Sequence, residues 1–262
     1  MIIAVTNQKG GIGKTTTCLN LAACAAQDGK KTCLIDLDPQ ANLTKTLVQT
    51  PEGRPTLFDF LNDSAALPEV VMETAMPDLY IVPANNNLAG LERDAADDPD
   101  MPYWLGRRLR PHSRKFDLIF IDTPPTLGAL TINALVAATH LLVPVQPSFL
   151  PLQGTDDLLE TYRIVQRQLN DLKLLGVLIT MYDPRTTLAR EAIAELQDAF
   201  GEKVMKTRIR RSIKIEESPA SGQSVLTYAP RSQGAEDYLR AYWELMGRAN
   251  PPSFNFQSGK EE

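Results

Sequence analysis

The run Lys-Gly-Gly-Ile-Gly-Lys-Thr-Thr at residues 9–16 constrains this chain more than any other feature of its sequence. An apolar, β-prone stretch, Ile2–Thr6, precedes the run. Residues 17–26 follow it with apolar side chains at helical spacing, up to Gly29. This order predicts a strand, a glycine-rich loop and a helix. Such a loop suits a phosphate chain, because glycines let backbone N–H groups approach the oxygens and the helix start adds its dipole.

The residues of the loop point to ATP and Mg²⁺ as ligands. Lys14 can reach the β- and γ-phosphates, and the Thr15 hydroxyl can ligate Mg²⁺. The usual loop has a glycine five positions before the Gly of Gly-Lys-Thr, where this chain has Gln8, and a second lysine, Lys9, comes next. This is a deviant form of the P-loop. The predicted nucleotide-binding residues of the loop are Gly10, Gly11, Ile12, Gly13, Lys14, Thr15 and Thr16.

Carboxylates follow two of the predicted strands. The second strand, 31–36, ends at Asp36 and is followed by Asp38, and the very apolar strand 116–122 ends at Asp122 in a Walker B pattern. Ligands of open α/β sheets lie at the carboxyl ends of the strands, so we expect these side chains near the P-loop. Asp122 can bind Mg²⁺, through a water. For Asp36 and Asp38 the alternative is a turn with helix-capping aspartates.

The whole chain alternates predicted strands with predicted helices. Further strands are expected at 78–83, 141–145 and 174–180, with helices between them, the last over 233–248. Apolar strands in this alternation predict an α/β fold, a mostly parallel twisted sheet covered by helices on both faces. We expect a single P-loop ATPase domain over residues 1–250 and a flexible C-terminal tail over 251–262. We find no secretory signal and no stretch of eighteen apolar residues, which predicts a cytoplasmic protein without a membrane span.

Three motifs together resemble a known family. Asn7–Thr16, Asp36–Gln40 and the Phe-Ile-Asp-Thr-Pro-Pro run at 120–125 look like the ParA/Soj/MinD family of deviant Walker A ATPases, in particular the chromosomal ParA (Soj) branch. The resemblance runs from Ile2 to about Met246. It implies that Asp38 holds the attacking water and that Asp36 lies near the Mg²⁺ shell, with Thr15 and Asp122.

Lys9 narrows the expected mechanism. It lies at the rim of a loop whose own phosphates are already served by Lys14, so it is well placed to reach the phosphates of a facing subunit. The resemblance implies that Lys9 crosses a face-to-face homodimer that holds two ATP molecules. The alternative is a solvated surface lysine. No glutamine or arginine finger accompanies the loop, so slow hydrolysis stimulated by a partner is expected, with a switch between dimer and monomer.

The charge distribution bears on DNA. The net charge of −5 argues against wholesale binding to nucleic acid, yet residues 203–214 form a basic run. The resemblance implies sequence-nonspecific, salt-sensitive contacts to double-stranded DNA, and hence association with the nucleoid. The alternative is a solvated face with salt bridges to Glu216 and Glu217. The predicted DNA-binding residues are Arg185, Arg211, Lys214 and Arg231.

The chain departs from the family beside this basic run. Soj-like proteins usually have Ile-Pro-Arg-Asn where this chain has Ile-Arg-Arg-Ser at 209–212. In the family that proline lies near the adenine. Met181 and Arg210 are the predicted contacts to the base here.

The predicted function is segregation of a chromosome or plasmid, with a ParB-like or other cargo-adaptor protein stimulating hydrolysis. The same switch could instead position a protein cargo, such as a microcompartment or a chemoreceptor cluster. A MinD-like membrane role is disfavoured, because residues 250–262 contain prolines and end in acidic residues. A metabolic P-loop enzyme would need an acceptor pocket, and nothing in residues 41–110 indicates one.

Overall fold

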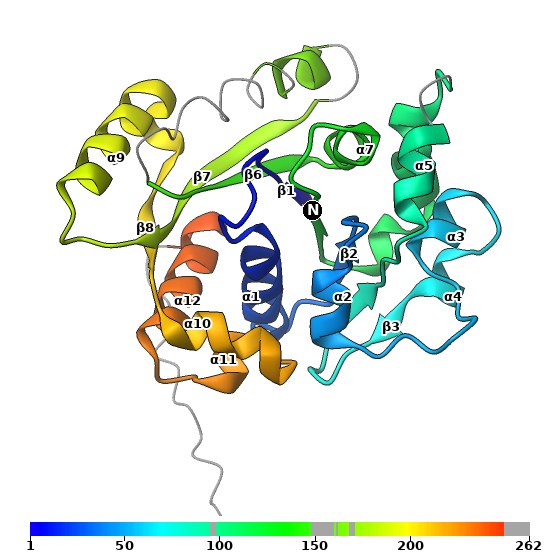
Figure 1. Ribbon diagram of the computed structural model, residues 1–262, viewed down its shortest axis with the longest axis horizontal. Coiled ribbons are helices and arrows are strands. Elements are labelled where there is room, and N and C mark those ends of the chain that lie inside the picture. The colour runs from blue at the N-terminus through cyan, green and yellow to red at the C-terminus, as the bar shows by residue number, and fades with distance from the viewer. Residues whose placement is uncertain (95–97, 148–159, 161, 168–170, 249–262) are drawn as a thin grey trace, which may run out of the picture.

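A single twisted sheet forms the centre of the protein, for which a computed structural model describes residues 1–94, 98–147, 160, 162–167 and 171–248 (Figure 1). Its eight strands lie in the order β3-β4-β2-β5-β1-β6-β7-β8. Neighbouring strands run parallel except β3, which pairs antiparallel with β4 at one edge. The strands are β1 (Ile2–Val5), β2 (Thr32–Asp36), β3 (Met72–Glu73), β4 (Leu79–Val82), β5 (Leu118–Asp122), β6 (His140–Val145), β7 (Lys173–Tyr182) and β8 (Val204–Arg210).

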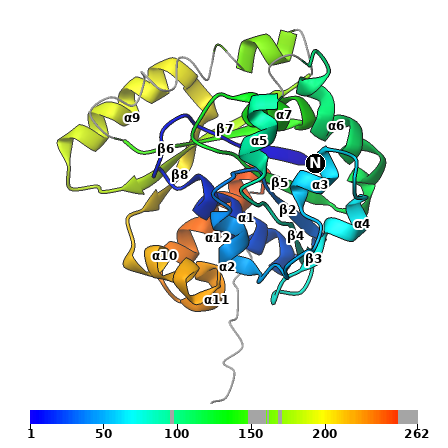
Figure 2. The same ribbon diagram turned by 45° about the vertical axis from the view of Figure 1, so that its right-hand side comes forward.

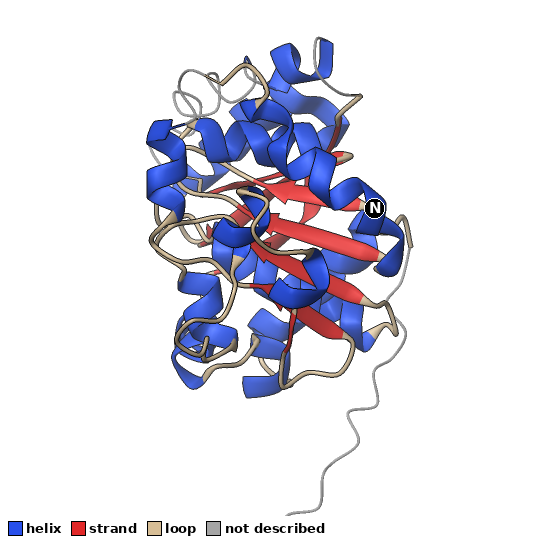
Figure 3. Cartoon of the chain, turned by 90° about the vertical axis from the view of Figure 1, so that its right-hand side faces the viewer, coloured by secondary structure: helices blue, strands red, loops and turns tan. Residues whose placement is uncertain are grey.

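Helices connect the strands and cover both faces of the sheet, as Figures 2 and 3 show. One face carries α1 (Lys14–Gln27), α2 (Asn42–Leu47), α10 (Ile213–Glu217), α11 (Val225–Tyr228) and α12 (Gln233–Leu245). The other carries α3 (Leu57–Leu61), α4 (Leu67–Val70), α5 (Leu88–Asp94), α6 (Trp104–Leu109), α7 (Ala129–Ala137) and α9 (Thr187–Phe200). This arrangement confirms the predicted fold class.

The strand sequences specify the two faces by simple alternation. In β1, Ile3 and Val5 belong to the buried cluster under α1 and α12, whereas Ala4 between them belongs to the cluster on the opposite face. In β5, Phe120 contributes to the first cluster and Ile119 to the second. Successive side chains of a strand point to opposite faces, and helices cover both, so nearly every position of these strands must be apolar.

The edge strand β8 is closed on its outer side by carboxylates of α12. Glu244 accepts hydrogen bonds from the backbone N–H groups of Lys206, at 2.6 Å, and Thr207, at 2.8 Å. Earlier in the same helix, Asp237 accepts from the N–H of Arg210, at 3.0 Å. These side chains occupy donors that an exposed edge would offer to another strand. Residues 204–210 of the basic run at 203–214 are therefore a strand of the sheet, which the charge pattern of the run did not indicate.

Two expectations concern regions beyond the core. Among the described residues, no helix has the length and apolar character needed to cross a bilayer. The predicted flexible tail, 251–262, lies outside the described residues, so the division into a domain and a tail stays a prediction.

Candidate functional site

The glycine-rich loop lies at the carboxyl end of β1, between the neighbouring strands β5 and β6. Gly11 and Gly13 adopt φ of 71° and 88°, in the left-handed region that strains other residues. The Asn7 side chain pins the loop, because its amide donates to the carbonyl oxygen of Pro144, at 2.9 Å, and its oxygen accepts from the N–H of Lys9, at 3.2 Å. The strand, glycine loop and helix predicted from the sequence are thus present, with α1 beginning at Lys14.

Lys14 points back into this loop, and its ammonium donates to the carbonyl oxygen of Lys9, at 3.1 Å. The side chain is buried, which lowers the pKa of Lys14, while the carboxylates of Asp122 and Asp38 oppose that shift. Lys9 itself is exposed at the rim of the loop. The loop therefore holds one cation inside and presents a second one outward.

Two predicted carboxylates meet at the ends of adjacent strands. Asp36 of β2 stands opposite Asp122 of β5 in the parallel register, and both are buried. Asp36 is held by Thr44, whose N–H and hydroxyl donate to it at 2.8 and 2.7 Å. Burial, with the nearby charge of Asp38, raises the pKa of Asp36 to about 6. Burial and the charge of Asp36 raise the pKa of Asp122 well above its usual range.

Asp122 is one of a few residues, with Thr6, Thr50, Arg54 and Trp243, that have buried polar side-chain atoms without a hydrogen-bond partner among the described residues. Both of its carboxylate oxygens are buried, and neither accepts a hydrogen bond with normal geometry from the described residues. A buried carboxylate in this condition is costly unless a cation or donor compensates it. Thr15 is one residue into α1, on the side of the loop that faces this acid, since its hydroxyl influences the pKa of Asp122.

These residues fit Mg²⁺. The described residues contain no group of three or more His, Cys, Asp or Glu side chains that could hold a metal ion by themselves. Mg²⁺ does not need one, because it is commonly held by one or two carboxylates together with substrate phosphates and waters. Asp122 and the Thr15 hydroxyl are the groups that would hold the ion here. Asp36, opposite Asp122 in the neighbouring strand, would lie near the ion without holding it directly. When bound, the ion neutralises charge on the phosphates.

Asp38 lies in the turn that follows β2 and is partly exposed. Its N–H donates to Asp36, at 3.2 Å, and its carboxylate accepts from the N–H of Gln40, at 2.9 Å. The turn-capping alternative is therefore part of its role. The charge of Asp38 also reaches Lys14, so the structure places this acid beside the loop as the sequence predicted.

A pocket beside the P-loop brings together the two residues predicted to contact the base, Met181 and Arg210. Gly13 of the loop and Thr16 of α1 line one side of this pocket, and Met181 and Arg210 line the other. The pocket thus brings together residues that are far apart in the sequence. The hydroxyl of Thr180 donates to the carbonyl oxygen of Ile12, at 2.8 Å, and ties this wall to the loop. Met181 has φ of 51°, an uncommon conformation for a non-glycine residue that is often found at functional sites.

Sequence reasoning missed two residues at this pocket, both from α12. Tyr238 is buried against it, with its hydroxyl 3.5 Å from that of Thr17. Asp237 binds the guanidinium of Arg210 through both carboxylate oxygens. No local pattern marks either residue, because α12 reads as an ordinary amphipathic helix.

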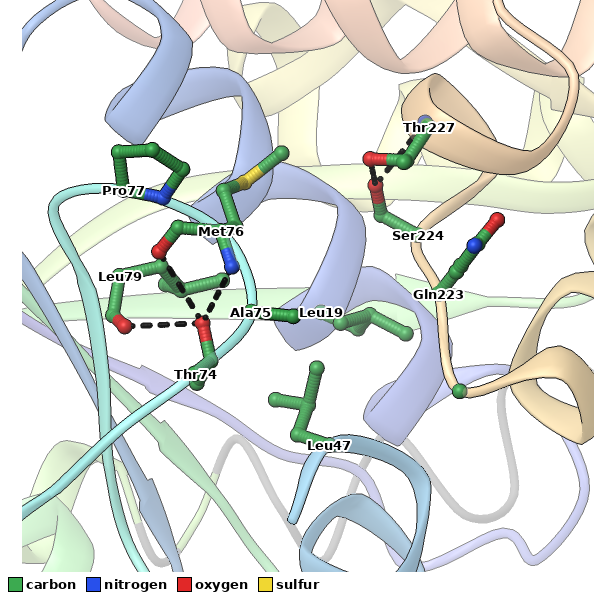
Figure 4. Close-up of a pocket in the computed structure, with 11 residues that line it drawn as sticks. Leu19, Leu47, Thr74, Ala75, Met76, Pro77, Leu79, Gln223, Ser224 and Thr227 are labelled. Carbon is green, nitrogen blue, oxygen red and sulfur yellow. Dashed lines mark hydrogen bonds between the residues drawn. The ribbon is translucent and has the colours of Figure 1, made fainter.

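A second pocket, of about 190 Å³, lies away from the P-loop, and Figure 4 shows its lining. Leu19 of α1 and Leu47, at the end of α2, form much of its apolar wall. Its hydroxyl groups are engaged locally: Thr74 donates to the carbonyl oxygen of Leu79, at 2.9 Å, and Ser224 lies 3.3 Å from the hydroxyl of Thr227. It contains none of the predicted site residues, whereas Gly13, Thr16, Met181 and Arg210 line the pocket beside the P-loop.

The predicted DNA-binding residues are exposed, and one of them, Arg211, also lines the pocket beside the P-loop. Arg185 follows β7, with 87% of its side chain exposed, and Arg211 follows β8, with 75% exposed. The two are close, because the N–H of Arg211 donates to the carbonyl oxygen of Tyr182, at 3.1 Å, and the charge of Arg211 reaches Asp183. Arg185 itself forms an ion pair with Asp183, at 2.7 Å.

Acidic neighbours also pair with the rest of the basic run. Lys214 of α10 binds Glu217, at 2.8 Å, and Arg211 contacts Glu216, at 3.4 Å. These are the salt bridges that the sequence offered as the alternative to DNA binding, and they are present in the free protein. Arg231 is exposed in the turn before α12.

Comparison with known proteins places the chain among nucleotide hydrolases. A family model described as an AAA domain matches residues 1–174. The sporulation initiation inhibitor protein Soj of Bacillus subtilis is 43% identical over 240 residues, which covers 91% of this chain and 95% of that protein. The chromosome-partitioning ATPase Soj of Thermus thermophilus is 41% identical over 248 residues, covering 94% and 95%.

A solved structure extends the similarity to three dimensions. The crystal structure of cobyrinic acid a,c-diamide synthase from Mycobacterium smegmatis, with bound ADP and magnesium, superposes with a TM-score of 0.82 at 33% identity. The match covers 97% of this chain and 98% of that one. Similarity of this extent takes in nearly the whole fold described above.

Proposed function

Because this chain belongs to the Soj/ParA family of chromosome-partitioning ATPases, and is an ATPase that uses ATP and Mg²⁺, we propose that ATP binding drives it into a homodimer that binds nonspecific DNA. In this proposal an adaptor protein on the chromosome or plasmid, ParB-like in kind, stimulates the slow hydrolysis that ends the dimeric state. The protein then cycles between the nucleoid and solution. The single observation that carries the proposal is the outward-facing Lys9 on a P-loop whose inner cation is already Lys14.

The division of labour between the two lysines supports a site shared by two subunits. Lys14 is buried in the loop, where it would neutralise the phosphates of its own nucleotide. Lys9 emerges from the same loop at an exposed position, with its carbonyl oxygen bound to the Lys14 ammonium. A cation at this rim would contact the phosphates of a nucleotide held by a facing subunit. ATP would then join two chains, and its hydrolysis would separate them.

Within one subunit, the remaining polar residues have distinct proposed roles. Thr15 and Asp122 hold the metal. Asp36, which Thr44 fixes in place through two hydrogen bonds, lies next to them and adds negative charge near the ion. Asp38 is the group that positions and polarises the attacking water, since it is partly exposed beside the loop. Orienting a nucleophile and stabilising charge are the main tasks in phosphoryl transfer. Slow turnover follows from the lack of a recognised finger residue in the sequence.

The ion pairs on the basic surface are compatible with DNA binding. An exposed ion pair contributes only about 0–1 kcal/mol, so exchanging Asp183 or Glu217 for a DNA phosphate costs little. The exposed side chains of Arg185, Arg211 and Lys214 would contact phosphates rather than bases. Two such surfaces in one dimer bind a polyanion far more tightly than a single one, which couples nucleotide binding to DNA binding.

The test is DNA binding in the presence of a slowly hydrolysed ATP analogue, across several salt concentrations. Replacing Arg185 or Lys214 with alanine should weaken binding equally for unrelated sequences and lower the slope of log affinity against log salt by about one. Arg107→Ala is the control, because Arg107 also forms an exposed ion pair, with Asp100, but on α6. Wild-type affinity and slope in both variants would refute this surface, and no DNA binding by wild type would refute the proposal.

A metabolic activity is the second candidate, since the similar Mycobacterium smegmatis structure is named as a cobyrinic acid a,c-diamide synthase. A metabolic P-loop enzyme that transfers phosphate or activates a carboxylate would need a pocket for its small-molecule acceptor. The two candidates differ in what accelerates ATP turnover. A partition ATPase should respond to double-stranded DNA together with its adaptor, whereas a metabolic enzyme should respond to its small-molecule acceptor alone. The adaptor would be sought as the product of a neighbouring gene.

A further inference from the structure

Arg210, which lines the pocket beside the P-loop, is held in place by a buried acid. Asp237 of α12 accepts the N–H of Arg210, at 3.0 Å, and its Nε, at 2.9 Å, through one carboxylate oxygen. The other oxygen binds the terminal Nη2 of the same guanidinium. Three donors of one residue thus end on one carboxylate, which fixes both the backbone and the plane of the side chain.

Burial makes this pair unusual among the ion pairs of the described residues. The side chain of Asp237 is 4% exposed and that of Arg210 is 32% exposed, whereas the Arg107–Asp100 pair is more than half exposed on both sides. A paired arginine and carboxylate at this depth have to satisfy each other, because an unpaired buried charge is strongly unfavourable. Arg210 also lines the pocket that Gly13, Thr16 and Met181 line, so this buried pair borders the pocket.

A guanidinium held in this way offers a defined chemical surface. It is planar and delocalised, so it can stack flat on the π-face of an aromatic ring, whereas a lysine in its place would have charge but no plane to stack. The bidentate bond to Asp237 orients the plane before any ligand arrives, so less rotational freedom is lost on binding. The phosphate loop lies directly beside this surface, so the base of a nucleotide bound there reaches the pocket.

We propose that Asp237 is a positioning residue for nucleobase recognition: it holds the guanidinium of Arg210 as a rigid wall against which the purine of ATP packs. The proposal rests on the nucleotide site assigned above. Relatives that carry a proline in place of Arg210 have no side chain for Asp237 to orient, so this wall is a property of the present chain. Its effect is confined to the base, because the phosphates are held by the loop.

The experiment compares ATP with inorganic tripolyphosphate, which has the phosphates but no base. Affinities for both, with Mg²⁺, are measured by calorimetry for wild type, Asp237→Asn and Arg210→Lys. Both variants should bind ATP about tenfold more weakly, roughly 1.4 kcal/mol, because neither presents an oriented guanidinium plane to the base, and both should bind tripolyphosphate as wild type does. The double variant should be little weaker than either single one, because both changes remove the same wall. Asp100→Asn, in the exposed pair, is the matched control and should change neither affinity.

Two results would overturn the inference. Equal losses for ATP and tripolyphosphate would mean that Asp237 supports the fold of the whole site and has no selective effect on the base. Unchanged ATP affinity in Arg210→Lys, a variant that keeps the charge but loses the plane, would mean that the base does not use this wall. Neither result would bear on the proposed dimer or DNA surface, which are tested by separate experiments. Binding of tripolyphosphate by wild type tests the P-loop itself.

Discussion

Replacing Asp122 with asparagine should stabilise the nucleotide-free protein while impairing its response to ATP and Mg²⁺. In the free protein the Asp122 carboxylate is buried without a hydrogen-bond partner among the described residues, next to the buried Asp36. Asparagine keeps the shape and removes the charge. The repulsion between the two acids then disappears, and with it the main group that would hold the metal.

The size of the gain can be worked out from the neighbouring acid. Asp36 has its pKa raised from an ordinary 3.8 to about 6, so ionising it in the folded protein costs roughly 3 kcal/mol at 1.36 kcal/mol per unit. Asp122 is shifted in the same direction. The amide of the variant is still buried with unsatisfied atoms, and this cost offsets part of the gain in the free energy of unfolding. We therefore expect a net gain of about 1–3 kcal/mol in the free energy of unfolding at neutral pH.

The sign of the pH dependence follows from these raised pKa values. Between pH 4 and the folded-state pKa the folded protein binds more protons than the unfolded chain, so wild-type stability falls as the pH rises through this window. Asp122→Asn removes the part of this slope that comes from Asp122 and keeps the part that comes from Asp36. Its advantage should be small at pH 5 and largest near pH 8.

The assay is thermal unfolding at pH 5 to 8, with and without ATP and Mg²⁺. Each kcal/mol should raise the Tm by roughly 2–4 °C for a domain of this size. ATP with Mg²⁺ should raise the Tm of wild type and raise that of the variant much less. Asp100→Asn, at an exposed site, serves as the control and should change neither curve by much. A variant that is less stable than wild type without nucleotide, or a difference that does not vary with pH, would refute the reasoning.

Three further predictions concern single residues. Lys9→Ala should give a monomer that still binds ATP; light scattering with ATP would decide, and an intact dimer would contradict the crossing role. Asp38→Ala should bind ATP and dimerise but hydrolyse it at least tenfold more slowly, which phosphate release would detect, and unchanged turnover would move the role elsewhere. Glu244→Ala, which leaves two N–H groups of the edge strand without their acceptor, should lower the free energy of unfolding in urea by about 1–2 kcal/mol. The exposed helix residue Glu236 is its control, since Glu236→Ala should cost about 0.5 kcal/mol or less, and equal losses would contradict an edge-specific effect.

Local sequence determined the frame of this protein. Residues 2–6, 31–36 and 116–122 are apolar runs that can be buried on both sides, so they had to become inner strands of a covered sheet. Gly11 and Gly13 stand where the backbone needs left-handed φ, and Lys14 and Thr15 open the helix that follows. Asp36, Asp38 and Asp122 end or follow strands, so the rule that parallel strands gather their carboxyl ends at one edge was enough to predict their meeting.

Only the tertiary structure decided which side chains from distant parts of the chain come into contact. The basic run at 203–214 reads as a charged surface, yet its first part is strand β8, because β7 offers it a partner and α12 supplies carboxylates to its outer edge. The buried pairing of Asp237 with Arg210 joins side chains 27 residues apart, and the unsatisfied state of Asp122 depends on what surrounds it in space. The periodicity and spacing of residues in a sequence indicate only which side of a segment is buried. Partners from distant segments, and the desolvation that they impose, exist only once the chain has folded.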